Sequence, residues 1–228
     1  MTAVQTFVAL ITHPRRAFTE LEKEPRFAVP MWLLVVTTMG MIIWYYSSVN
    51  VDWLISQTLA SRPLTSAQRA QAAGLLSRGT FLFGALIAGT IALFVVQLVT
   101  AFYFFFICEF LEAQLTFRKW FAFSWWCSVP QLISVVVTAV LLLIHDSSQA
   151  SPGVLSPLSL NELFFHYDQA DNGYTLLNSI SLVQLWTLVL MVIGVQTWTK
   201  RSWLLSIVIV LAPRLVIYGV WYWFAFLR

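Results

Sequence analysis

Charged residues are scarce in this sequence, and their scarcity excludes a water-soluble fold. Only 10% of the 228 residues are Asp, Glu, Lys or Arg, against roughly a quarter in soluble domains. Two cysteines, Cys108 and Cys127, are too few for a disulfide scaffold and form no CxxC zinc pattern. The net charge is only +3 and no basic stripe occurs, so nucleic acid is not an expected partner. The absence of HExxH, GxSxG, P-loop and GxGxxG motifs argues against an enzyme, a metal site and a cofactor.

Apolar and aromatic side chains dominate what is present. Hydrophobic residues make up 59% of the chain, with 11 Trp and 18 Phe, and the mean hydropathy is +0.78. The charges leave five stretches long enough to cross a hydrocarbon core of about 30 Å, which takes roughly 20 helical residues. These stretches are residues 27–51, 79–108, 120–144, 172–199 and 202–227. Backbone amides in lipid must bond within their own segment, so each stretch predicts a helix.

The predicted fold is therefore all-α, a polytopic membrane protein with a bundle of five transmembrane helices. The predicted spans cover approximately residues 30–49, 80–107, 120–144, 174–198 and 202–226. The first apolar run begins near residue 27 and is too long for a cleavable signal peptide. We therefore expect the N-terminus to be retained.

Lys and Arg are unevenly divided between the two sides of this predicted bundle. The side of the N-terminus holds eight of them, and the opposite side holds four. Cytoplasmic loops are rich in Lys and Arg, so this division predicts a cytoplasmic N-terminus and an outside C-terminus. The eight are Arg15, Arg16, Lys23, Arg26, Arg118, Lys119, Lys200 and Arg201, and the four are Arg62, Arg69, Arg78 and Arg228.

Residues 1–26 precede the first span and predict two short amphipathic helices. Val4, Phe7, Val8 and Ile11 recur at helical spacing. Pro14 can begin a second helix, with Phe18 and Leu21 on one face. With basic residues on their flanks, these helices either lie along the inner headgroup layer or pack under the bundle.

A further helix outside the membrane is predicted after the first span. Thr65 is followed three residues later by Gln68, which is the pattern of a capping box. Leu64, Leu75 and Leu76 supply a modest apolar face. We interpret the segment as a surface helix rather than a lid.

Arg214 is the one charged residue inside a predicted span. Counted from Ser202 at 1.5 Å per residue, it lies about 18 Å from the inner face, near mid-membrane. Pro213 removes a helix hydrogen bond and frees the carbonyl of Ile209 at the same depth. An ionisable group at this depth predicts a functional site by default. The alternative is that Arg214 snorkels outward or caps carbonyls and sets helix register.

Other polar groups fall at a similar depth in neighbouring spans. Gln131 directly follows Pro130 in the third span, and Gln184 lies in the fourth. The candidate mid-membrane polar site therefore consists of Arg214, Gln131, Gln184, Pro130 and Pro213.

The second span carries small residues at positions that favour close helix packing. Gly84, Ala88 and Ala92 are spaced four residues apart, with Ala85 and Gly89 on the adjacent row. Small residues at this spacing let helix backbones approach closely. The span is predicted to lie centrally in the bundle or at a dimer contact.

The inner ends of the second and third spans predict a charged surface. Glu109 and Glu112 stand three residues apart beside Arg118 and Lys119, which suits an ion-pair cluster. A carboxylate pair that handles protons is the alternative interpretation. The candidate inner-surface contacts are Arg15, Arg16, Glu109, Glu112, Arg118 and Lys119.

Three segments that together touch most of the chain carry a family resemblance. They are His13 to Phe18 with Leu21, Pro25 and Pro30; Thr116 to Arg118 followed by Ser128 to Pro130; and Leu182 to Gly194 with Trp186, followed by Thr199 to Ser202. In their order around five spans they resemble bacterial members of the Yip family, five-span relatives of the Ypt/Rab-interacting membrane proteins.

The resemblance implies a single membrane domain over residues 1–228, in the bacterial inner membrane, with a cytoplasmic N-terminus and a periplasmic C-terminus. It also implies a role in membrane organisation or trafficking. Eukaryotic relatives engage prenylated small GTPases, but this chain lacks their Asp-Leu-x-Gly-Pro type motif. Residues Glu109 to Gln114 also stand where a glycine-rich link is expected, so the resemblance carries over no GTPase partner.

Two functional hypotheses follow. The first is a non-enzymatic membrane scaffold that acts on membrane lipid, on membrane-protein partners or on a second copy of itself. The alternative is a transporter or channel for a small solute or anion, with its site around Arg214.

Overall fold

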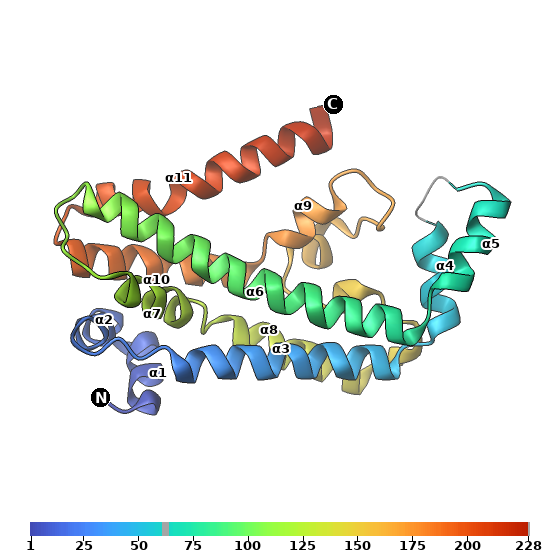
Figure 1. The fold of residues 1–228 in the computed structure, drawn as a ribbon, viewed down its shortest axis with the longest axis horizontal. Coiled ribbons are helices and arrows are strands. Elements are labelled where there is room, and N and C mark those ends of the chain that lie inside the picture. Colours follow the sequence, from blue (N-terminus) through green and yellow to red (C-terminus); the bar gives the residue numbers. More distant parts are fainter. Residues whose placement is uncertain (61–63, 228) are drawn as a thin grey trace. The chain divides into compact units, whose positions relative to one another are not determined.

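The computed structural model describes residues 1–60 and 64–227, and it confirms the all-α membrane fold (Figure 1). Five helices within these residues are long and apolar enough to cross a membrane. They are α3 (Ala28–Ser48), α6 (Arg78–Glu109), the pair α7 (Phe117–Cys127) and α8 (Gln131–Ile144), α10 (Leu182–Thr199), and α11 (Trp203–Tyr222) with its continuation to Phe226. Arg62 and Arg228, two members of the charge count, lie outside the described residues.

The helices divide into two compact units, each built from three parts of the chain. Unit 1 consists of Met1–Val35, Ala92–Gln131 and Val183–Gly219, and unit 2 consists of Val36–Ile91, Leu132–Leu182 and Val220–Arg228.

Unit 1 begins with the two predicted amphipathic helices, α1 (Ala3–Thr12) and α2 (Pro14–Lys23). Thr2 caps α1 by accepting the Gln5 N–H, while the Gln5 side chain accepts the Thr2 N–H, which completes a capping box. Pro14 opens α2, since its fixed φ suits the first helical position. The helix ends at Lys23, two residues before Pro25, because the residue preceding a proline is disfavoured in helical conformation.

An aromatic cluster fills the core of unit 1. Its buried rings come from α2, α6, α7 and the end of α10: Phe18, Phe104, Trp120, Phe123 and Trp198. The Trp120 ring centroid lies 5.0 Å from Trp198 and 5.3 Å from Phe123 in edge-on arrangements, which aromatic pairs prefer. A Cβ atom at Gly194 would overlap the Phe123 ring, so this packing requires glycine on α10.

Unit 2 has a smaller core around Tyr45, Val49, Leu54 and Leu142. It also contains α4 (Val51–Ala60), α5 (Ser66–Leu75) and α9 (Tyr174–Ser179). The capping box at Thr65 and Gln68 is confirmed at the start of α5. The helix α4, which follows α3 after a break at residues 49–50, was not predicted.

The predicted fourth span is wrong at its start. The prediction begins at residue 174, but α9 ends at Ser179 and α10 begins only at Leu182. Between them the chain is extended and pairs with residues 158–160, where the Leu160 N–H donates to the Ile180 carbonyl at 2.7 Å. The partner of this pairing lies about 20 residues away in the chain, so local hydropathy does not reveal the break.

Candidate functional site

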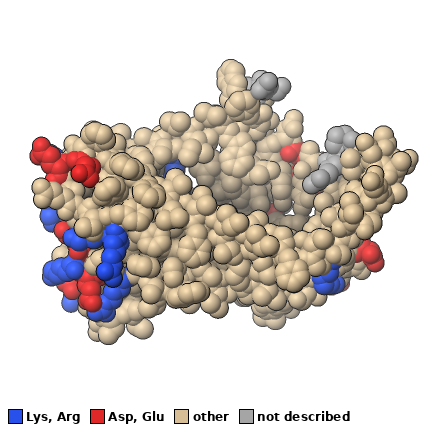
Figure 2. All heavy atoms as spheres, viewed as in Figure 1, with Lys and Arg blue, Asp and Glu red and all other residues tan. Residues whose placement is uncertain are grey.

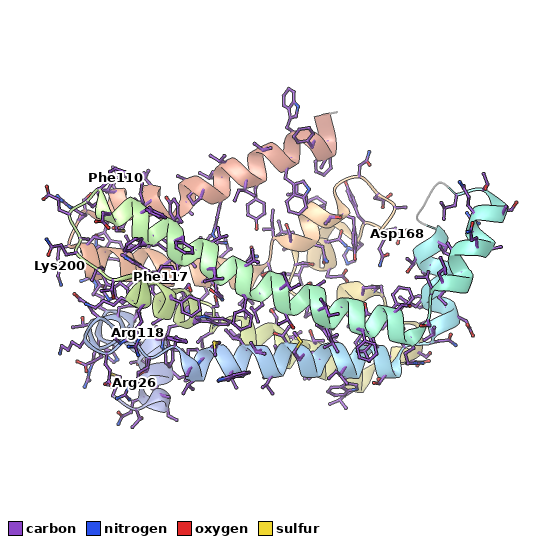
Figure 3. All side chains as sticks on the ribbon, viewed as in Figure 1. Arg26, Phe110, Phe117, Arg118, Asp168 and Lys200 are labelled. Atoms are coloured by element: carbon purple, nitrogen blue, oxygen red, sulfur yellow. The ribbon has the colours of Figure 1, made fainter. Side chains whose placement is uncertain are left out.

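The N-terminal platform is the first candidate site, and we define it as α1, α2 and the turns at residues 110–116 and 200–202. Figure 3 shows Arg26, Phe110, Arg118 and Lys200 at the end of unit 1 that carries these elements. In Figure 2 most of the Lys and Arg side chains in view gather at the same end, together with several acidic ones. Of the six predicted inner-surface contacts, Lys119 is half-buried and the other five are exposed: Arg15, Arg16, Glu109, Glu112 and Arg118.

Tryptophan side chains hold the start of the chain on unit 1. The Trp198 indole N–H donates to the Phe18 carbonyl at 2.8 Å, and the Trp126 indole N–H donates to the Arg26 carbonyl at 2.6 Å. The Phe18 side chain is fully buried between Phe123 and Trp198. The helix α2 is therefore part of the core, which agrees with the interpretation that it packs under the bundle.

The helix α1 buries only one of its faces. Thr6, Ala9 and Leu10 are buried, whereas Val4 is 71%, Val8 56% and Ile11 69% exposed. These three apolar side chains share one helical face because they are spaced four and three residues apart. The face is apolar, and no described part of the chain covers it.

Arg15 and Arg16 lie on α2 next to this face. The Arg15 guanidinium stacks 5.2 Å from the ring centroid of Trp203, the first residue of α11. Arg16 lines the groove between α1 and α2. Neither arginine forms an ion pair with an acidic side chain in the described part of the chain.

Ion pairs on the platform involve a different set of residues. Glu20 accepts from Lys23 at 3.1 Å and lies 4.0 Å from the Met1 ammonium, so it links α2 to the start of α1. The hydrogen bond from Lys23 and the Lys23 charge lower the pKa of Glu20. Glu24 pairs with Arg26.

The ion-pair cluster predicted around Glu109 and Glu112 is not formed. Across residues 1–60 and 64–227, neither carboxylate pairs with Arg118 or Lys119. The reason is that α6 ends at Glu109, and Glu112 lies in the following turn with a positive φ of 60°, so the two do not share a helical face. Arg201 instead holds this turn by donating to the Leu111 carbonyl at 2.8 Å.

The mid-span polar groups are the second candidate site. Arg214 lies half-buried about 16 Å along α11 from Trp203, and its guanidinium lies 3.7 Å from the Met191 sulfur on α10. One turn further, the Tyr218 hydroxyl donates to the Gln184 side-chain oxygen at 3.4 Å. Two of the predicted polar residues, Arg214 and Gln184, thus lie along the same α10–α11 contact.

Two polar side chains of α6 that the sequence interpretation missed form hydrogen bonds near the two prolines. The Tyr103 hydroxyl of α6 donates to the Ile209 carbonyl at 2.6 Å, the group that Pro213 frees. The Gln97 amide of α6 donates to the Ser128 hydroxyl at 2.9 Å, two residues before Pro130. Counting residues along the second span could have identified Gln97 as a polar residue deep within it. No local feature of the sequence predicts the partner of Gln97 or of Tyr103.

Gln131 is not joined to Arg214 by any hydrogen bond among the described residues. It begins α8, where its backbone N–H donates to the Ser128 carbonyl at 2.9 Å. Its neighbour Pro130 is buried in the turn between α7 and α8. The five predicted mid-membrane residues therefore do not form one hydrogen-bonded cluster.

The small-residue row on α6 is exposed. Gly84, Ala88 and Ala92 are all exposed, and a Cβ at Gly84 would meet no atom within 4 Å. The adjacent row makes the close approach instead, since a Cβ at Gly89 would lie 3.2 Å from the Ile42 side chain.

Nothing in the described residues forms a metal site. No group of three His, Cys, Asp or Glu side chains within residues 1–60 and 64–227 could hold an ion. Cys108 and Cys127 are free and fully buried.

Comparison with known proteins gives one finding. A family model described as the Yip1 domain matches residues 8–224. The matched range contains all three segments in which the sequence resembles that family. No curated protein and no solved structure matches the chain.

Proposed function

Because the chain belongs to the Yip1 domain family, we propose that it is a non-enzymatic membrane scaffold that organises lipid through its N-terminal platform. The uncovered apolar face of α1 carries this proposal. A helix with an apolar face and basic neighbours is stable in the interface plane, with its apolar side buried about 5–10 Å at the headgroup boundary. Held in place by Trp126 and Trp198, the platform presents that face as a fixed part of the fold.

The charges support a particular orientation of the platform. Eight Lys and Arg residues lie on the side of the N-terminus, which favours a cytoplasmic platform and an outside C-terminus. We place the protein in the bacterial inner membrane on this basis and on the family resemblance. Reporter tags fused to the two ends should be found in opposite compartments, and tags in the same compartment would contradict the odd number of spans.

The experiment that tests the proposal measures the depth of α1 in a bilayer. An environment-sensitive fluorophore is attached at Val8→Cys in the full chain, where the buried Cys108 and Cys127 stay unlabelled. A matched label at Gln5→Cys reports the polar edge of the same helix. In nanodiscs we expect lipids with a shallow quencher to quench the Val8 label more strongly than the Gln5 label. Equal exposure of both labels to a water-soluble quencher would refute an interfacial α1.

The outward row of small residues supports a protein partner within the membrane. Gly84, Ala88 and Ala92 are exposed on α6, and small residues favour close helix association in lipid. The partner is a second copy of the chain or another membrane protein. Cross-linking of the wild type and of Ala88→Leu in membranes tests this contact, because a leucine would keep the two helix backbones apart.

Arg214 supports a second candidate function, passage of a small anion or solute. Its guanidinium lies near mid-membrane, and within the described residues it has a weak sulfur acceptor and no carboxylate partner. An uncompensated cation at this depth is costly and is typical of an ion or substrate path. Proteoliposomes with an internal halide-sensitive dye test this function by iodide entry. Flux that is lost in Arg214→Gln at equal protein content would favour transport, and no flux above empty liposomes would exclude this anion path.

A further inference from the structure

Two grooves of unit 1 meet at Arg16. One, of about 370 Å³, is lined by His13, Pro14, Arg15, Arg16, Ile193 and Trp203. The other, of about 430 Å³, runs along α1 beside Val4 and Val8. Both are lined by His13 and Arg16, so the two grooves are adjacent, and Arg16 lies between the groove of Trp203 and the groove along α1.

The charge of these two grooves differs from that of the other platform grooves. No Asp or Glu lines either of the two grooves at Arg16. By contrast, the groove at the turns combines Glu22 and Glu112 with Lys200 and Arg201. A further groove, between the start of the chain and Trp126, mixes Glu20 and Glu24 with Lys23 and Arg26. Among these grooves of unit 1, the two at Arg16 are the ones with basic lining residues and no acidic lining residue.

The walls of the first groove are apolar close to the two guanidinium groups. Trp203 is 44% exposed and supports the Arg15 guanidinium on its ring face. Ile193 adds an aliphatic wall. Guanidinium groups match phosphate oxygens with planar paired donors, and a tryptophan side chain is favoured at the level of the lipid headgroups. The groove therefore combines donors for a phosphate with a wall for the first methylenes of an acyl chain.

We propose that the groove of Arg15, Arg16 and Trp203 binds the headgroup of an anionic phospholipid from the leaflet that faces the platform. The proposal rests on the interfacial α1 of the proposed function and adds a lipid preference to it. Charge complementarity decides the occupant, because two arginines in a groove with no acidic lining residue favour a headgroup with net negative charge over a zwitterionic one.

Native mass spectrometry of the detergent-purified full chain tests the preference. Phosphatidylglycerol or phosphatidylcholine is titrated in mixed micelles, and the affinity of the first bound lipid is compared. Each basic residue at an anionic surface contributes a factor of about five, so Arg15→Gln/Arg16→Gln should weaken phosphatidylglycerol binding roughly 25-fold. Its binding of phosphatidylcholine should change little.

A matched control removes the same charge from the same end of unit 1. Arg118→Gln/Lys119→Gln lies outside both grooves and should leave the first phosphatidylglycerol affinity within about twofold of wild type, since diffuse attraction is screened over a Debye length of about 10 Å. Equal losses in the two double variants, or equal affinities of the wild type for both lipids, would overturn the site. Full displacement of the lipid by millimolar inorganic phosphate would also overturn it, by identifying free phosphate as the ligand. Unchanged thermal unfolding of both variants shows that the fold is intact.

The depth of the Val8 label distinguishes failure of the headgroup site from failure of the interfacial α1. A Val8 label that remains inserted while the lipid preference is absent refutes the headgroup site alone. A preference that persists while the Val8 label lies in water refutes the interfacial α1.

Discussion

Unit 1 and unit 2 both have cores of apolar side chains, but they are stabilised in different ways. Unit 1 packs buried rings from four helices, with Trp120 and Phe123 at the centre. In unit 2, hydrogen bonds join helices to loops: the Tyr45 hydroxyl donates to the Ala150 carbonyl at 2.8 Å and the Thr138 hydroxyl donates to the Val154 carbonyl at 3.0 Å. Arg78 similarly donates to the Val49 carbonyl at 3.1 Å. The larger aromatic core therefore stabilises the unit that holds the platform, whereas unit 2 combines a smaller core with hydrogen bonds to its loops.

The largest expected effect comes from removing the central ring of unit 1. Trp120→Ala should cost about 3–5 kcal/mol, since truncation of a buried tryptophan leaves a cavity. The loss should appear as faster amide hydrogen exchange in α2 and α7, with α4 unaffected. Leu54→Ala is the matched truncation in unit 2 and should accelerate exchange in α4 instead. Equal acceleration in both units for either variant would abolish the distinction between them.

Gly194→Ala tests whether unit 1 is packed tightly enough to reject one methyl group. The added Cβ would overlap Phe123 and approach Phe18 to 3.1 Å. Overpacking of this kind costs about 1–3 kcal/mol, measured by thermal unfolding in detergent. Gly84→Ala, on the open row of α6, is the control and should be neutral or slightly stabilising. If Gly194→Ala leaves the thermal stability unchanged, the aromatic core accommodates an extra methyl group and is not tightly packed.

A pair of tyrosine variants compares one hydroxyl from each unit. Tyr103→Phe leaves the Ile209 carbonyl without its donor inside a span and should cost about 1–2 kcal/mol. Tyr45→Phe, at the Ala150 loop carbonyl, should cost about 1 kcal/mol. Pro213→Ala supplies a backbone N–H for the Ile209 carbonyl, so Tyr103→Phe should cost less in that background. Identical costs of Tyr103→Phe with and without Pro213 would show that the hydroxyl does not compensate the proline.

The smallest effect is a pH dependence at the start of unit 1. The lowered pKa of Glu20 means that the folded state binds its proton less readily than the unfolded state. Its contribution is complete above the ordinary glutamate pKa of about 4.3, and it is lost as the pH falls through the lower folded value. Amide exchange in α1 should therefore accelerate modestly on acidification in the wild type. Glu20→Gln should show the faster exchange already at neutral pH, without that acid transition.

Features that depend on interactions within one segment could be predicted from the sequence, whereas features that depend on contacts between distant residues could not. Five spans, the two amphipathic helices and the capping box at Thr65 were all predictable, because apolar transfer and capping act over one segment. The start of α10 and the pairs Tyr103–Ile209 and Gln97–Ser128 were not, since each joins residues far apart in the chain. Sequence spacing suggested that Glu109 and Glu112 share a helical face and pair with their basic neighbours. Because α6 ends at Glu109, Glu112 lies in the following turn and the two carboxylates do not share a face.

The amino-acid sequence by itself determined the solvent of this protein, because a chain with so few charges can bury its apolar surface only in lipid. It also determined where charge gathers, at the ends of spans. Only the tertiary structure decided which apolar face of the N-terminal helices is left uncovered and which arginines line a groove without acidic side chains. Those outcomes depend on packing between segments, where Phe18 enters the aromatic core and Val4 and Val8 do not.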